Sequence, residues 1–229
     1  KAREVIAPLI EGIDLSKEAF PHMCVREGTI LGVPTRLFSV SFTGELGFEI
    51  NVPSAYGRAV WEAVYAAGER FGITPYGTET MHVLRAEKGY IIVGQETDGT
   101  ATPDDANLGW AVGKAKKDFV GKRSLARDAM SAPDRRQLVG LKTTDPKIVL
   151  EEGAQIVTDP SAPVPVPMLG FVTSSYHSAV LGRSIALAMV KGGRARIGQK
   201  LMVPMPTHAI EVEVVEPVFY DPKGERLNG

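Results

Sequence analysis

The sequence predicts an α+β protein in which mixed helices and strands, residues 1–130, precede a small antiparallel β-barrel, residues 131–229. Three observations lead to this fold class. A strand pattern with a glycine turn comes first, a long helical pattern follows it, and the last hundred residues consist of short apolar runs separated by glycine or proline. Several short strands at such spacing are typical of a small barrel.

The first strand pattern predicts a β-hairpin. Residues 35–42 alternate between apolar and polar side chains, and residues 43–47 contain two glycines that mark a tight turn. Alternation resumes over residues 48–52, where Glu49 points away from the packed face. The apolar faces expected are Phe38, Val40 and Phe42 on the first strand and Phe48, Ile50 and Val52 on the second.

Helical periodicity predicts three helices, over residues 54–72, 78–88 and 121–130. The first begins at Ser54, which suits an N-cap, and ends at Gly72. Its expected apolar stripe is Val60, Trp61, Val64 and Tyr65. In the second helix, which Gly89 ends, Val83 and Leu84 are expected to pack, and Arg85 and Glu87 are the charged members.

A change of composition near residues 131–136, Ser-Ala-Pro-Asp-Arg-Arg, predicts a domain boundary between residues 130 and 131. The region beyond it predicts five strands, and a proline-rich stretch at residues 159–167 predicts an exposed extended loop. The strands are expected at residues 138–141, 168–173, 185–190, 201–203 and 210–215.

Composition argues against several classes of partner. The net charge of the 229 residues is −1, so no basic excess indicates nucleic acid or an acidic membrane surface. No apolar run approaches the roughly 18–20 residues that span a bilayer. The single cysteine, Cys24, cannot form a disulfide within the chain and is expected to be structural and buried. Its lack of a partner fits a reducing compartment, and a cytoplasmic location is predicted.

The sequence contains no strong catalytic or metal-binding pattern. The four histidines are scattered singly, and the neighbouring His22 and Cys24 lack a second ligand pair. Gly192, Gly193 and Gly198 do not stand between a strand and a helix as a phosphate loop requires, so a barrel turn is expected there. The chain also begins inside a helical pattern without an initiator methionine, and we expect the fold to continue upstream.

Glu49 is the most informative polar residue of the hairpin, and two interpretations remain open from its position alone. It is either a solvated carboxylate or a carboxylate held at the rim of a pocket. A fixed carboxylate accepts two N–H donors from a flat heterocycle such as an aminopyrimidine.

Several segments together resemble the aminomethyltransferase family, to which the glycine-cleavage T-protein belongs. Residues 41–50 are similar to the family's aromatic-Thr-Gly-Glu-x-Gly-aromatic-Glu signature, and residues 84–89 to its Leu-Arg-Leu-Glu segment. Further similar segments, in the family's order, are residues 102–112, 119–121, 170–174 and 181–188. Residues 75–100 and 217–222 resemble the α subunits of heterotetrameric sarcosine oxidases more than T-proteins.

The resemblance implies a fold and an activity. The fold is a partial aminomethyltransferase-like folate-binding domain, residues 1–130, followed by the C-terminal barrel, residues 131–229. The activity implied for the intact assembly is oxidation of sarcosine at a flavin on a partner subunit, with the one-carbon unit then passed to tetrahydrofolate bound by this chain. Flavin and NAD belong to other parts of that complex, and the implied partners are folate and the other oxidase subunits. No nucleic acid or membrane partner is implied.

The resemblance also assigns residues. Glu49 corresponds to the glutamate that grips the pterin, Tyr220 lies near a folate-contacting position, and Phe42 either flanks the ring or belongs to the core. Met81 replaces a family arginine that contacts the ligand, so the folate tail is held in another way or more weakly. The family's catalytic aspartate lies upstream of residue 1, and we expect the chain alone to have little transfer activity. The alternatives are a non-catalytic scaffold module and a stand-alone aminomethyltransferase.

Overall fold

The computed structural model describes residues 1–228 and divides into two compact units. Unit 1 consists of Lys1–Leu84 together with the C-terminal residues from Asp221 onward, and unit 2 consists of Arg85–Tyr220. The predicted boundary between residues 130 and 131 falls inside unit 2. A division by contacts differs from a division into family domains, so that boundary stays a prediction.

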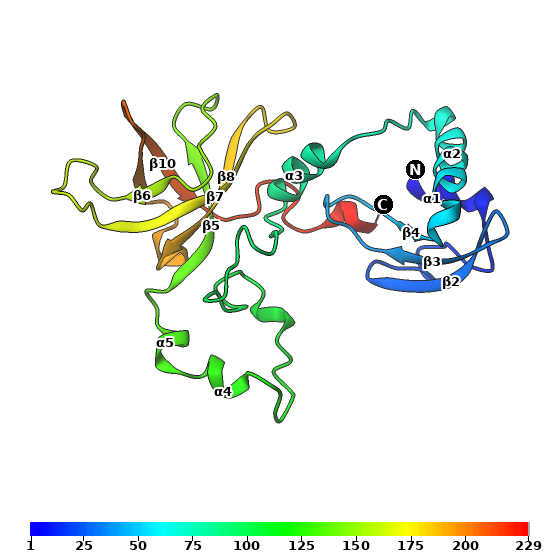
Figure 1. The fold of residues 1–229 in the computed structure, drawn as a ribbon, viewed down its shortest axis with the longest axis horizontal. Helices are drawn as coiled ribbons and strands as arrows, with labels where there is room; N and C mark the ends of the chain where they lie inside the picture. Colours follow the sequence, from blue (N-terminus) through cyan, green and yellow to red (C-terminus); the bar gives the residue numbers. More distant parts are fainter. Residues whose placement is uncertain (229) are drawn as a thin grey trace. The chain divides into compact units, whose positions relative to one another are not determined.

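Unit 1 is built on an antiparallel sheet with strand order β1-β2-β3-β4 (Figure 1). The strands are β1 (Ile10–Glu11), β2 (Cys24–Ile30), β3 (Val33–Ser39) and β4 (Glu49–Asn51). A short helix, α1 (Ala2–Ile6), and a 3-10 turn, η1 (Ala7–Leu9), precede them. Cys24 begins β2 and is only half-buried, so the expectation of a buried cysteine is met in part.

The predicted hairpin is confirmed, but its packed face is wrong on the first strand. In β3 and β4, Leu37 lies opposite Ile50 and Phe38 lies opposite Glu49. Leu37 is fully buried in the core of unit 1, whereas Phe38 is half-buried. β3 ends at Ser39, so the chain leaves the sheet before Phe42. The alternation of residues 40–42 therefore does not determine which of these side chains faces the core.

The helix that follows is confirmed with a different start and a narrower stripe. A 3-10 turn, η2 (Ser54–Tyr56), precedes α2 (Gly57–Gly68), and η3 (Glu69–Phe71) ends at Gly72 with φ 74°. The side chain of Ser54 makes no cap, because it lies within the 3-10 turn. Trp61 is 57% exposed and stacks on Tyr65, so this pair does not join the core. The core side of the helix is Val60, Val64 and Ala67.

The predicted second helix is also confirmed, as α3 (Thr78–Glu87), and Gly89 follows it with φ 67°. Its burial is opposite to the prediction. Val83 and Leu84 are half-buried, while Arg85 and Glu87 are among the buried residues of unit 2. The charged side chains are buried because polar partners from the barrel meet them.

Unit 2 contains the predicted barrel, which closes in the order β10-β5-β8-β7-β6-β9 (Figure 1). Every pairing in the ring is antiparallel. The strands are β5 (Arg136–Thr143), β6 (Gln155–Val157), β7 (Met168–Ser178), β8 (Arg183–Lys191), β9 (Lys200–Pro204) and β10 (Ala209–Val215). Five were predicted and β6 was not. The α+β fold class is therefore confirmed.

Two short helices, α4 (Lys122–Leu125) and α5 (Asp128–Ser131), replace the single helix predicted over residues 121–130. The glycines near residue 192 form a turn with a 3-10 segment, η5 (Gly193–Arg196), as expected. The remaining 3-10 segments are η4 (Gly109–Ala111) and η6 (Glu225–Asn228). No helix within residues 1–228 has both the length and the apolar character to cross a membrane.

Candidate functional site

The predicted folate-contacting residues of unit 1 lie on the outer face of its sheet and in the loop before β4. The alternation of β4 turns Ile50 toward the core and leaves Glu49 exposed on the opposite face, beside the half-buried Phe38. Phe42 is half-buried in the loop that joins β3 to β4. The structure thus places a solvent-accessible carboxylate on a strand, with an aromatic side chain as its cross-strand neighbour.

A hydrogen bond and an ion pair shape that loop. The side-chain oxygen of Ser41 accepts a 3.0 Å hydrogen bond from the backbone N–H of Gly44, whose φ of 85° suits a residue without a side chain. Glu45 pairs with Arg226 at 3.2 Å, which ties the loop to the C-terminal segment of the same unit. These contacts fix the turn between Phe42 and Glu49.

Of the two remaining residues that the resemblance singled out, Tyr220 lies in unit 2 and Met81 lies in unit 1. Tyr220 is half-buried in unit 2, where its backbone N–H donates a 3.0 Å hydrogen bond to the carbonyl oxygen of Glu87. Met81 occupies the second turn of α3 in unit 1 and is half-buried. A thioether makes no bidentate contact with a carboxylate, so the position of Met81 offers nothing to an anionic tail.

Within unit 2, the sequence reasoning missed a buried polar cluster around Arg85. The Arg85 and Glu96 side chains are both fully buried and pair at 3.0 Å between Nη1 and Oε2. Ser174 on β7 bridges them, because its hydroxyl accepts from Arg85 Nη2 and donates to Glu96 Oε1, both at 2.5 Å. Nearby, the Ser178 hydroxyl donates to Glu87 at 2.6 Å. These contacts fasten the end of α3 and the following loop to β7.

A cavity of about 170 Å³ lies beside this cluster within unit 2. The loop of residues 94–101 forms one wall, and Phe171 and Met189 of the barrel form another. The guanidinium of Arg136 lies 5.4 Å from the centre of the Phe171 ring. The lining therefore combines apolar barrel side chains with charged groups from the loop and from β5.

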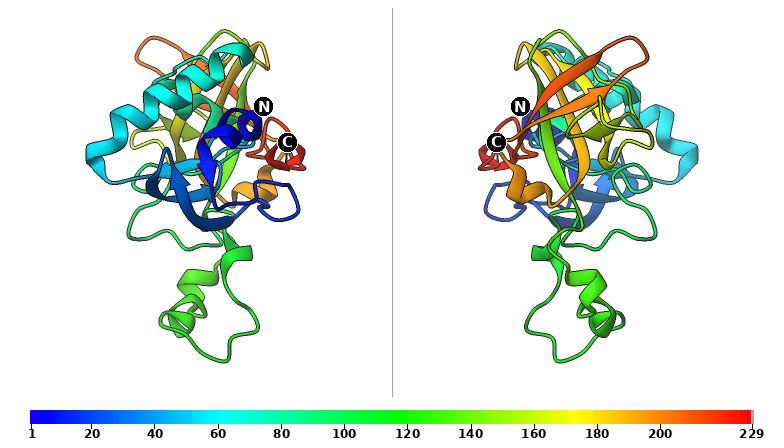
Figure 2. Two further views of the ribbon diagram at one scale, coloured as in Figure 1. Left: turned by 90° about the vertical axis from the view of Figure 1, so that its right-hand side faces the viewer. Right: turned by 90° about the vertical axis from the view of Figure 1, so that its left-hand side faces the viewer.

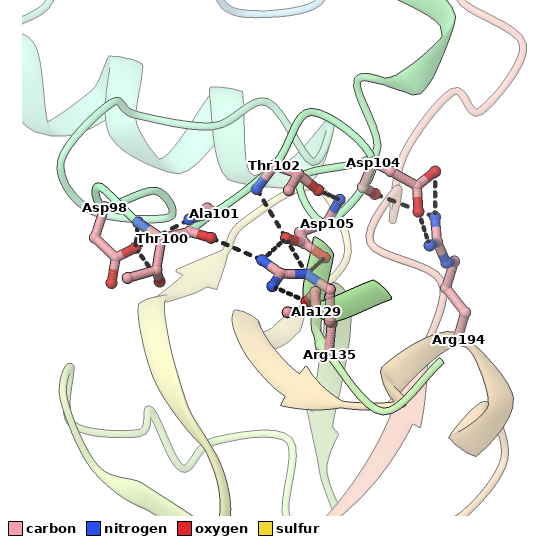
Figure 3. A network of polar contacts seen from close by, with 9 residues as sticks. All are labelled: Asp98, Thr100, Ala101, Thr102, Asp104, Asp105, Ala129, Arg135 and Arg194. Carbon is pink, nitrogen blue, oxygen red and sulfur yellow. Dashed lines mark hydrogen bonds and ion pairs between the residues drawn. The ribbon is translucent and has the colours of Figure 1, made fainter. Parts of the chain in front are cut away.

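A second network, shown in Figure 3, borders the same cavity. Asp105 is 3% exposed at its side chain and accepts hydrogen bonds from Arg135 Nε at 3.0 Å and Nη2 at 2.5 Å. It also accepts from the backbone N–H of Thr102 at 2.8 Å, while the Thr102 hydroxyl accepts from the N–H of Asp105 at 3.2 Å. This reciprocal pair has the spacing of a capping box, Thr-x-x-Asp, which is a signal readable in the sequence.

The two aspartates near this cavity are held ionised. Burial alone raises the pKa of the Asp105 carboxyl, but the hydrogen bonds from Arg135 and Thr102 and the charge of Arg135 outweigh burial and lower it. The pKa of Asp98 is lowered mainly by the hydrogen bonds from the Thr100 hydroxyl and N–H. Both side chains serve as acceptors for the chain itself, which suits structural anchoring.

The ionisable side chains of the two units differ in their surroundings. Among residues 1–228, no three His, Cys, Asp or Glu side chains form a group that could hold a metal ion. Among the buried ionisable groups of unit 2, Arg85 pairs with Glu96, Asp105 pairs with the half-buried Arg135, and Glu87 accepts a hydrogen bond from Ser178. Glu49 is the predicted site residue that remains exposed and is available to a ligand.

Family models match most of the chain. The GCVT N-terminal domain matches residues 1–116, and the glycine cleavage T-protein C-terminal barrel domain matches residues 136–221. Among solved structures, the aminomethyltransferase T of the glycine cleavage system from Bartonella henselae superposes with a TM-score of 0.77 at 25% identity. That match covers 95% of this chain and 56% of the other.

Curated relatives fall in two groups. The sarcosine oxidase α subunits of Corynebacterium sp. strain P-1 and Rhizobium meliloti are 50% and 40% identical over all of this chain, which spans 24% and 23% of their length. The aminomethyltransferase of Symbiobacterium thermophilum is 35% identical over 96% of this chain and 57% of its own length. The chain belongs to the glycine cleavage T-protein family of aminomethyltransferases, with both its N-terminal-type and its barrel domain represented.

Proposed function

We propose that this chain is the folate-binding part of a sarcosine oxidase α subunit. The observation that carries the proposal is 50% identity over the whole chain to a protein named sarcosine oxidase subunit alpha, against 35% to an aminomethyltransferase. The reaction proposed for the intact assembly oxidises sarcosine at a flavin on another subunit and passes the one-carbon unit to tetrahydrofolate. The reduced flavin passes its two electrons to molecular oxygen, and the products are glycine, hydrogen peroxide and 5,10-methylenetetrahydrofolate.

Residues of this chain fit the pterin end of such a ligand better than its tail. The exposed Glu49 carboxylate offers two acceptor oxygens to the adjacent N–H groups of an aminopyrimidine. Phe42, in the same unit as Glu49, is a half-buried aromatic side chain that suits contact with a flat ring. A folate contact by Tyr220, which belongs to unit 2, stays a separate proposal from the resemblance. Bound folate supplies the nitrogens that accept the one-carbon unit. The role of the chain is to orient that ring, and orientation alone contributes several kcal/mol to a reaction.

The chain alone is expected to bind folate without sustained transfer. The resemblance to the family assigns the catalytic aspartate to a position that none of these residues occupies. Met81 in place of the family arginine favours the rival proposal, a scaffold module that keeps the fold without binding folate. A cytoplasmic location remains part of the proposal.

Calorimetric titration with tetrahydrofolate and with folinic acid tests these proposals. Glu49→Gln is expected to weaken affinity by roughly 1–3 kcal/mol, because one charge-assisted bond is lost. Glu27→Gln is the matched control, since Glu27 lies on the same face of the same sheet and is exposed. Equal affinities of the wild type and Glu49→Gln would remove Glu49 from the site, and no heat with either ligand would favour the scaffold.

A further inference from the structure

The strands of the barrel carry a second apolar surface, on the outside of the ring. Along β8, Val190 belongs to the core inside the ring, whereas its neighbour Met189 belongs to a separate buried cluster. Ala86 of α3 packs in that outer cluster, and the segment after α3 runs outside the ring of strands (Figures 1 and 2). The cavity of about 170 Å³ beside the Arg85 cluster lies between this segment and the outer face of the barrel.

Aromatic and aliphatic side chains form the floor of this cavity. Phe171 of β7 and Met189 of β8 are cross-strand partners, and both line the cavity. Arg136, at the start of β5, projects from the outer face as well, because Leu138 two residues later belongs to the outer cluster. The Arg136 guanidinium lies 5.4 Å from the centre of the Phe171 ring, so a cation–π contact holds it at the cavity.

Arg136 is the cation that the cavity offers to a ligand. Two acidic side chains of the lining are already neutralised, Glu96 by Arg85 and Asp105 by Arg135. Within residues 1–228, no group accepts a hydrogen bond from the Arg136 guanidinium. Its N–H donors can therefore serve a ligand carboxylate in the bidentate geometry that arginine provides.

Asp98 supplies the opposite charge from the loop of residues 94–101. Its Oδ1 atom accepts hydrogen bonds from the hydroxyl and N–H of Thr100 and from the N–H of Ala101. No donor among residues 1–228 reaches its Oδ2 atom. The hydrogen bonds from Thr100 and, to a lesser extent, the charge of Arg136 lower the pKa of Asp98, so this carboxylate is ionised. The lining thus presents one cation and one anion to the same space.

The walls of the cavity are fixed before a ligand enters. Gln95 donates from Nε2 to the carbonyl oxygen of Thr173 at 2.9 Å, which ties the loop to β7. Next to it, Glu96 Oε2 accepts from the N–H of Ile92 at 2.7 Å, and Glu96 Oε1 accepts from the Ser174 hydroxyl at 2.5 Å. A site whose walls are already ordered loses less conformational entropy on binding.

Size and charge limit the class of ligand. A cavity of about 150 Å³ holds a benzene molecule, so about 170 Å³ admits a ligand of slightly larger size. Such a volume excludes a nucleotide or a pterin. A phosphate ion fits the volume, but it would meet the Asp98 carboxylate and leave Phe171 and Met189 without an apolar contact. A molecule that carries both charges on a short aliphatic frame matches the cation, the anion and the floor together.

We propose that the cavity binds a small amino acid as its zwitterion. The carboxylate pairs with the Arg136 guanidinium, and the ammonium group faces Asp98. An aliphatic group lies on the floor of Phe171 and Met189. Sarcosine and glycine have this chemistry, and sarcosine adds an N-methyl group for the floor. The choice of these two amino acids rests on the proposed function, in which they are substrate and product.

The test follows the chain, labelled with 15N in its arginine side chains, by NMR during titration with sarcosine. The Nε–H resonance of Arg136 is expected to shift in a saturable way, with a dissociation constant of about 1 mM or tighter. Arg136→Gln identifies that resonance and is expected to weaken sarcosine binding, measured by saturation transfer to the ligand, about tenfold or more.

Arg70→Gln is the matched control. The exposed Arg70 lies 4.6 Å from the centre of the Phe71 ring, so it makes the same kind of ring contact outside the cavity lining. Its affinity for sarcosine is expected to stay within about twofold of that of the wild type.

Asp98→Asn separates a zwitterion site from a site for any anion. Asparagine keeps the Oδ1 acceptor for Thr100 and Ala101, so the loop is expected to hold, as the Arg136 resonance would show. In the wild type, acetate is expected to bind about tenfold more weakly than sarcosine. In Asp98→Asn, sarcosine is expected to bind about tenfold more weakly than in the wild type and acetate more tightly, because a like charge has been removed.

Four outcomes would overturn the proposal. These are no saturable shift with either sarcosine or glycine up to about 50 mM, equal affinity of Arg136→Gln and the wild type, acetate binding as tightly as sarcosine in the wild type, and weakening of both ligands together in Asp98→Asn. The folate titration tests Glu49 of unit 1, which does not line this cavity. Amino-acid binding without folate binding would count against the proposed function alone, and the reverse would count against this cavity alone.

Discussion

Asp105 and Arg135 are 30 residues apart in sequence and connect the two ends of the segment of residues 106–134 through one ion pair, with 2.5 Å between Nη2 and Oδ2. The Asp105 side chain is almost fully buried, and Arg135 also reaches the carbonyl oxygen of Thr100 at 2.7 Å. The pair therefore holds the two ends of a long loop of unit 2 together. Removing either partner leaves the other without its counter-charge.

Asp105→Asn is expected to lower the free energy of unfolding by roughly 1–3 kcal/mol, because the buried carboxylate loses its charge-assisted hydrogen bonds from Thr102 and from the half-buried Arg135. Urea unfolding followed by circular dichroism measures this. Asp104→Asn is the control, since Asp104 is 70% exposed in its pair with Arg194 and is expected to cost less than about 1 kcal/mol. Equal losses in the two variants would contradict the assignment.

The contribution of Asp105 is expected to depend on pH. Its pKa is lowered in the folded chain, so its stabilisation is complete above the unfolded carboxyl value of about 4 and is lost as pH falls through the folded value. The difference in unfolding free energy between the wild type and Asp105→Asn is therefore expected to shrink below about pH 4. A difference that grows on acidification would refute this sign.

Arg85→Met is expected to destabilise unit 2 by roughly 3–5 kcal/mol, because Glu96 is left buried and unpaired. Adding Glu96→Gln removes the stranded charge, so the double variant is expected to be more stable than the sum of the single losses predicts. A double-mutant cycle of unfolding free energies measures the coupling. Arg58→Met, in an exposed pair with Glu62, is expected to cost about 0.5 kcal/mol or less.

Comparing Gly89→Ala with Gly72→Ala separates the cost of a strained backbone conformation, which both variants have, from the cost of a steric clash, which only Gly89→Ala has. Both glycines have positive φ, 67° and 74°, and alanine in this region costs about 1–2 kcal/mol. A Cβ at Gly89 would lie 2.6 Å from the carbonyl oxygen of Pro217, whereas nothing lies near one at Gly72. Calorimetric melting is expected to show a loss of about 2–5 kcal/mol at Gly89 and the smaller loss at Gly72. Equal losses would mean that the backbone at Pro217 moves freely.

Helices and strands with a strong hydrophobic periodicity were predictable from the sequence. Which of their side chains are buried was less predictable. The barrel and the hairpin follow from alternation, but alternation alone does not say which face packs. Phe38 is larger than Leu37, yet register with Ile50 places Leu37 in the core. β6 has three residues, too few to give a clear periodic signal. Trp61 fits the helical period, but it is exposed and stacks on Tyr65 outside the core, which periodicity alone does not reveal.

The polar clusters depend on contacts between residues far apart in sequence. Arg85 and Ser174 are 89 residues apart, and no local rule predicts that a charged residue on a helix will be buried against a strand so distant. The Thr102–Asp105 capping box is the exception, because its spacing is local. For Glu49, alternation predicted the outward direction, which the structure confirms, and its ligand stays a prediction.

The pairing between β6 and β9, called the joint below, is the place where the barrel is expected to open first. One registered pair, Val157 with Met202, completes the ring there, next to a register shift between Ile156 and Val157. A closed ring has no outer strand to fray, so its amide hydrogens are released to solvent only when some joint separates. Amides at this joint should therefore exchange ahead of those between β7 and β8, and unzipping of the ring should start from β6.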